Sequence, residues 1–158
     1  MKVLSPLAVG AALLGAALPA AAHGQTLTVT GAHNLIFGAV LPGVARVIAR
    51  NDAANSGRFN IVTDQNGNQM RLTFTLPAAM IGPAGAQMPL AFQSGDAGYS
   101  ATQNIGSQVA FDPRVPFTAV IPNNGRASVF LGGRANPATN QRAGAYTATI
   151  TLTVTILQ

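Results

Sequence analysis

The chain has 158 residues, of which 48% are hydrophobic and only 8% are charged, and its formal net charge is +5. Its nine basic residues are spread singly, with little aromatic interleaving, which argues against a nucleic-acid-binding groove because such a groove needs clustered charge. Cysteine is absent, so a buried core rather than a disulfide framework has to stabilise the fold.

Residues 1–22 have the pattern of a secretory signal peptide. Lys2 gives a positive start, residues 3–18 are almost wholly apolar, and residues 19–22 offer small side chains for cleavage. The alternative is a membrane anchor, but the apolar run is short for a span and contains proline and glycine. Cleavage after Ala22 or after Gly24 predicts a mature chain exported by a Sec-type route to the periplasm and then to the cell surface or the medium, with no transmembrane segment.

Residues 23–34 are predicted to form an N-terminal extension of the mature chain. Residues 25–30 alternate threonine with aliphatic residues, which is typical of a strand, and this alternation places Leu27 and Val29 on one face. Because this short strand lies at the free end of the mature chain, Leu27 and Val29 are candidate anchors of a donated β-strand.

Residues 35–158 are predicted to form one β-sandwich domain. Asn66-Gly67, between apolar runs at 58–63 and 69–76, predicts a hairpin because both residues tolerate positive φ. Residues 78–87 show little periodicity, and residues 93–113 are predicted to be a long loop with a strand near 108–111. Other predicted strands are 44–50, 88–92, 115–121 and 127–131, the last broken by Gly132-Gly133 before a polar loop at 134–142. At least seven short strands without helical periodicity indicate an all-β, immunoglobulin-like antiparallel β-sandwich.

The clearest strand in the chain is its last, residues 143–158. Apolar side chains and threonines alternate along it, so that one face carries Tyr146, Ala148, Ile150, Leu152, Val154 and Ile156. A run of twelve such residues would extend roughly 40 Å, about twice the usual strand length. Such a strand needs neighbours, and this face is therefore the candidate acceptor groove for an added strand.

No constellation in the sequence is equipped for catalysis or for cofactor or metal binding. The four acids, Asp52, Asp64, Asp96 and Asp112, fall in predicted loops or beside proline. The mature chain has two histidines and no cysteine or glutamate, so a zinc site would need both histidines and an aspartate. Residues 64–68 imitate the start of a calcium loop, but no glutamate closes it. The sequence therefore predicts a protein that is not an enzyme.

Six short motifs, in this order over residues 27–158, resemble the bacterial DUF4402 family: residues 35–38, 57–59, 72–77, 88–90, 129–133 and 143–147. The resemblance implies kinship with chaperone–usher pilins and spore-coat-U-type secreted proteins, which are immunoglobulin-like sandwiches with an incomplete or terminally complemented sheet. Gly144 and Tyr146 fit the last strand of a pilin. The near-terminal tyrosine of pilins is replaced here by Ile156-Leu157, and the pilin disulfide is absent.

The unpartnered last strand and the resemblance favour a structural subunit of a surface fibre or coat. In that hypothesis the N-terminal extension of one copy completes the sheet of the next by β-strand addition. Its partners are other copies or related subunits, and the resemblance implies a periplasmic chaperone and an outer-membrane usher. The alternative is a self-complemented, monomeric secreted binding or adhesion module. In that module residues 26–30 fold onto their own sheet, and the loops at 78–87 and 93–112 carry the ligand surface.

Overall fold

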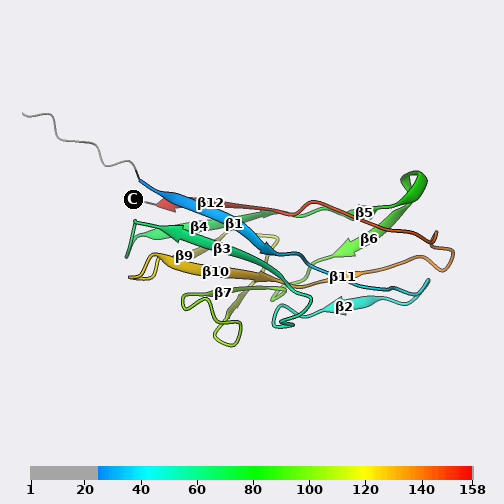
Figure 1. The fold of residues 1–158 in the computed structure, drawn as a ribbon, viewed down its shortest axis with the longest axis horizontal. Helices are drawn as coiled ribbons and strands as arrows, with labels where there is room; N and C mark the ends of the chain where they lie inside the picture. The colour runs from blue at the N-terminus through cyan, green and yellow to red at the C-terminus, as the bar shows by residue number, and fades with distance from the viewer. Residues whose placement is uncertain (1–24, 158) are drawn as a thin grey trace, which may run out of the picture.

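The computed structural model describes residues 25–157 as an antiparallel all-β sandwich, which confirms the predicted fold class (Figure 1). The predicted signal peptide and its cleavage site lie outside these residues. The strands are β1 (Leu27–His33), β2 (Arg46–Ile48), β3 (Gly57–Thr63), β4 (Gln69–Thr75), β5 (Ala79–Ile81), β6 (Gln87–Ala91), β7 (Ala97–Ser100), β8 (Val109–Phe111), β9 (Phe117–Val120), β10 (Arg126–Leu131), β11 (Gly133–Ala135) and β12 (Thr151–Leu157). One 3-10 turn, η1 (Pro83–Gly85), separates β5 from β6.

The strands form three sheets. A five-stranded sheet has the order β1-β3-β10-β7-β8, a three-stranded sheet β12-β4-β9, and a four-stranded sheet β2-β11-β6-β5. The molecule is elongated, and β1 begins near the end of β12 at one end, whereas β2, β5 and β6 lie toward the other (Figure 1).

The main core lies between the five-stranded and three-stranded sheets. Alternate side chains of facing strands fill it, including the fully buried Ile61, Leu72 and Val129. Phe111 and Phe117 stack within it with their ring centroids 4.3 Å apart. This packing explains the period of two in β4, where Met70 and Leu72 are buried while Gln69 and Arg71 are exposed.

A smaller core lies beneath the four-stranded sheet. Phe37, Ile48, Met88 and Ala135 are buried there, and Tyr146 packs against them. The two cores share Leu35 and Leu90 at their edges, so the second extends the sandwich lengthwise.

The predicted hairpin between β3 and β4 is wrong. The turn at residues 64–68 exists, but β3 pairs with β1 and β10, whereas β4 pairs with β12 and β9. The turn carries the chain from one sheet to the other, and the β9–β10 connection beside it does the same. Two backbone hydrogen bonds join the two connections: the N–H of Ile121 donates to the carbonyl of Asn68 (2.8 Å), and the N–H of Thr63 donates to the carbonyl of Gly125 (2.9 Å). Local turn chemistry allowed the reversal without choosing the pairing partner.

Three short strands fall in segments that the sequence predicts to be irregular. β7 lies within the predicted 93–113 loop and is buried at all four positions, so neither of its faces is exposed to solvent. β5 lies in the stretch at 78–87, and β11 begins at Gly133 of the predicted break and enters the predicted loop at 134–142; each is three residues long. The predicted strand near 108–111 is present as β8.

The long last strand is also shorter than predicted. β12 covers seven residues, and before it only Thr147 forms a bridge, to Ile81. The last strand faces β4 along residues 151–157 and β5 at Thr147, and residues 76–78 connect those two partner strands. Pro77 in this connection has no N–H to donate to the last strand. The chain before β12 therefore pairs only at that bridge.

Candidate strand-binding groove

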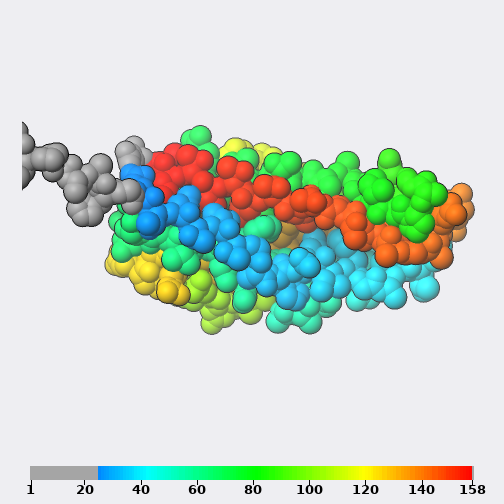
Figure 2. All heavy atoms as spheres, turned by 45° about the horizontal axis from the view of Figure 1, so that its top comes forward, coloured from blue at the N-terminus to red at the C-terminus, as the bar shows by residue number. Residues whose placement is uncertain are grey.

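β1 and β12 are both edge strands and run along the same side of the sandwich (Figures 1 and 2). Within residues 25–157, β1 pairs only with β3, and β12 pairs only with β4. Each strand therefore has one open edge, and an edge strand carries a row of backbone groups available to another strand.

The backbone direction in β12 follows from two independent hydrogen-bonded pairs. Thr147 and Ile81 exchange both backbone bonds (2.8 and 3.0 Å), so Thr147 directs its polar groups at the sheet. The carbonyl of Asn68 accepts from Ile121 on the β9 side, so even-numbered residues of β4 face β9 and odd-numbered ones face β12. Both observations place the N–H and C=O of odd-numbered residues of β12 toward β4. Those of Leu152, Val154 and Ile156 consequently point to the open side.

The same reasoning applies to β1. The N–H of Thr63 donates to Gly125, so odd-numbered residues of β3 face β10 and even-numbered ones face β1. In β1, Thr28 and Thr30 therefore direct their backbone groups at β3, and those of Leu27 and Val29 point to the open side.

A groove of about 860 Å³ lies between the end of β1 with the segment that follows it and the segment that precedes β12. Gly31 and residues 33–40 line one wall, and residues 141–148 with Ile150 line the other. Its floor is mainly apolar and includes Phe59, Met80, Met88 and Leu90. Figure 2 shows β1 and the segment leading through β12 as two neighbouring ridges along the molecule.

The structure places the two predicted donor anchors in β1, paired within their own chain. Leu27 is opposite Thr63 and 37% exposed, whereas Val29 is opposite Ile61 and half-buried against the main core. The other five residues of β1 are exposed. The side chains of β1 therefore contribute little burial, and backbone pairing is its main attachment.

The six predicted acceptor residues separate into three environments. Leu152 is buried in the main core, and Ile150, Val154 and Ile156 pack against it half-buried. Tyr146 packs against the smaller core, and Ala148 is exposed on the groove wall.

Tyr146 is fixed at its hydroxyl as well as at its ring. The hydroxyl donates to the carbonyl of Arg142 (2.7 Å) and accepts from Nε2 of Gln141 (2.6 Å). Its ring lies against Gly82, where a Cβ would collide with it. The wall at residues 33–40 and the floor residues Met80 and Met88 were not predicted, because their apolar runs are interrupted by turn residues.

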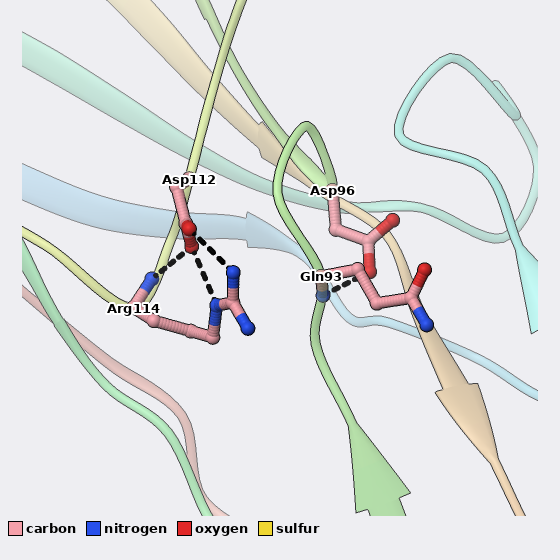
Figure 3. A network of polar contacts seen from close by, with 4 residues as sticks. All are labelled: Gln93, Asp96, Asp112 and Arg114. Carbon is pink, nitrogen blue, oxygen red and sulfur yellow. Dashed lines mark hydrogen bonds and ion pairs between the residues drawn. The ribbon is translucent and has the colours of Figure 1, made fainter.

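The opposite side of the sandwich is bridged by side chains. The hydroxyl of Tyr99 donates to the carbonyl of Val120 (2.8 Å), and burial raises the pKa of Tyr99 to about 12. Nearby, Arg114 forms a two-pronged ion pair with Asp112, and the N–H of Gln93 donates to Asp96 (Figure 3). The hydrogen bonds from Arg114 lower the pKa of Asp112 to about 2.

Each aspartate accepts hydrogen bonds from its own turn, Asp64 also from Thr26 before β1, and in the described part of the chain no two of the four share a hydrogen-bond donor. Asp52 accepts from Ala54 and Asn55, and Asp64 from Thr26 and Gln65. Hydrogen bonding to these neighbours lowers the pKa of both carboxyl groups. Within residues 25–157 no group of three histidine, aspartate or glutamate side chains is placed to hold a metal ion.

No model of a known protein family matches the chain, and no curated protein matches it. The resemblance to the DUF4402 family therefore stays a prediction. Among the residues that the structure describes, no helix is long and apolar enough to cross a membrane.

Proposed function

We propose that the chain is a non-enzymatic structural subunit of a bacterial surface fibre or coat that assembles by β-strand addition. The observation that carries the proposal is the open edge of β12, together with an apolar groove of about 860 Å³ lined by the segment that leads into β12, residues 141–148 and Ile150. An added strand would bond to the backbone groups of Leu152, Val154 and Ile156. Main-chain bonds of this kind provide affinity, and side-chain pockets provide register.

The donor in this proposal is β1 of a neighbouring copy. Cleavage after Ala22 would leave four residues before β1, so an N-terminal donor has to include β1 itself. The register shift between Gly31 and His33 marks where the strand would separate from its own sheet.

The energetic cost of that exchange is small because the backbone bonds that β1 loses on β3 are replaced by comparable bonds to β12 of the neighbour. Leaving β3 breaks backbone pairing and the partial packing of Val29, and backbone pairing is regained on the neighbour. Full burial of Leu27, now 37% exposed, would add roughly 0.5–1 kcal/mol, about a third of the value for a fully exposed leucine. Before assembly, a strand from a periplasmic chaperone would cover the groove, and an outer-membrane usher would receive the subunit.

The second candidate function is a self-complemented, monomeric secreted binding or adhesion module. The pairing of β1 with β3 inside one chain, in register from Leu27 to Gly31, favours this alternative. The side chain of Thr63 adds to it by donating to the carbonyl of Thr26 (2.6 Å).

A disulfide that ties β1 to β3 distinguishes the two functions. Thr28 and Val62 are exposed register partners in a hydrogen-bonded pair, whose Cα atoms in an antiparallel ladder are about 5.5 Å apart, a separation that a disulfide can span. The native chain has no cysteine, so Thr28→Cys with Val62→Cys introduces one defined bridge. We expect the mature wild-type chain to form SDS-resistant multimers and the oxidised double variant to stay monomeric in light scattering.

Reduction of the bridge should restore assembly, and each single cysteine variant should assemble under reducing conditions. Multimers that form equally well with the bridge closed would rule out donation of β1. A wild-type chain that remains a clean monomer at micromolar concentration would support the self-complemented module.

A further inference from the structure

A second pocket, of about 390 Å³, opens on the outer face of the five-stranded sheet. Phe130 of β10 is 2% exposed and forms its floor, and the turns at residues 53–56 and 103–105 form its rim. Its volume falls within the range of small-molecule sites, roughly 300–1,000 Å³. Neither the proposed assembly nor the open edges require this pocket.

The charged and polar groups of this pocket suit an anion. Arg58 is exposed, and its guanidinium makes no hydrogen bond or ion pair within residues 25–157. No carboxylate lines the pocket, and Asp52, next to its rim, is engaged by Ala54 and Asn55. Guanidinium groups bind carboxylates through two parallel hydrogen bonds.

His33 and Asn104, which also line this pocket, can form hydrogen bonds with ligand hydroxyl groups. Nδ1 of His33 lies 2.8 Å from the carbonyl oxygen of Ser56. Because a carbonyl oxygen can only accept a hydrogen bond, Nδ1 carries the proton in the neutral ring, and Nε2 is therefore able to accept a hydrogen bond from a ligand. The side-chain oxygen of Asn104 accepts from Gly106 (2.8 Å), which leaves its NH₂ group to donate.

The rim is held in position before any ligand binds. Ser100, Thr102 and Ser107 share hydroxyl hydrogen bonds of 2.6–3.4 Å, and the N–H of Asn104 donates to Ser100 (3.1 Å). Gln103 has a φ of 59°, a conformation that non-glycine residues seldom adopt. A rigid rim reduces the ordering cost of binding.

We propose that this pocket binds an acidic sugar of the uronic acid class. The sugar carboxylate pairs with Arg58, and ring hydroxyls bond to Nε2 of His33 and the amide of Asn104 at the rim of the pocket. The site shares His33 with the groove, and His33 lies beyond the register shift that follows Gly31, so the site stays complete if only the residues before that shift leave β3.

The test is a titration of the mature protein with D-galacturonate, followed by two-dimensional NMR. We expect saturable binding, with shifts concentrated on His33, Arg58 and Asn104. D-galactose, which lacks the carboxylate, and acetate, which lacks the ring, should each bind at least tenfold more weakly. Arg58→Gln should weaken galacturonate binding about tenfold.

Arg126→Gln is the matched control, because it removes the same charge from an exposed residue of β10, four positions from Phe130. It should leave the affinity within twofold of wild type, and thermal unfolding should verify that both variants are folded. Equal losses in the two variants, acetate binding as tight as galacturonate, or no saturation would each overturn the proposal.

Discussion

Gly132→Ala should destabilise the folded protein by about 3 kcal/mol or prevent it from folding. Gly132 lies where β10 passes into β11 and the chain changes sheet. A Cβ there would collide with the carbonyl oxygen of Ile48 and lie 2.7 Å from the backbone nitrogen of Arg50. Because these are backbone atoms, no side-chain rotation relieves the collision, and β2 would have to separate from β11. Urea unfolding followed by circular dichroism measures the effect.

Gly31→Ala is the matched control for this substitution. Gly31 also lies in a strand region, but a Cβ there would meet nothing within 4 Å. Its free energy of unfolding should stay within about 0.5 kcal/mol of the wild-type value. Equal stability of the two alanine variants would contradict the close approach of the β10–β11 connection to β2.

Val154→Pro should abolish multimer formation while leaving the subunit folded. The N–H of Val154 points to the open side of β12, so proline removes a group that only an added strand would use. The expected loss of stability is about 1 kcal/mol, from reduced packing of a half-buried side chain. Sedimentation of the mature variant measures its assembly.

Thr153→Pro should mainly reduce the stability of the folded subunit, whereas Val154→Pro should mainly reduce its assembly. Its N–H points toward β4, so proline removes a group from the existing ladder and leaves an acceptor on β4 unsatisfied, at an expected cost of about 2 kcal/mol or more. The pair separates folding from assembly at adjacent positions. If Val154→Pro assembles normally, or destabilises the subunit as much as Thr153→Pro, the assignment of the open edge is wrong.

Strands with one buried face could be predicted from the sequence, and their partners could not. β1, β3, β4 and β12 have clear apolar alternation because one face of each meets the main core. The partner of β3 was predicted wrongly, since the Asn-Gly turn fixes a reversal and says nothing about which sheet receives the next strand. β7 was missed because it is only four residues long and buried at every position, with Ser100 hydrogen-bonded to Ser107 instead of exposed to solvent.

The candidate groove could be predicted in part. Alternation identified the core-facing residues of the last strand, and burial of Leu152 with the partial burial of Ile150 and Val154 agrees with that face. The opposite wall, at residues 33–40, has no period that would place it there. It is positioned by long-range contacts, such as the N–H of Ile36 donating to Asn55 (2.8 Å). The acceptor role of the groove and the donor role of Leu27 and Val29 stay predictions.

Amide hydrogen exchange along β12, in the monomer and in the multimer, tests the assembly proposal most directly. In the monomer, the amides of Leu152 and Val154 should exchange rapidly, whereas those of Thr153 and Thr155, which face β4, should be protected. In the multimer, all four should be protected, because an added strand would bond to the open edge. Amides of Leu152 and Val154 that stay unprotected in the multimer would contradict strand addition at β12.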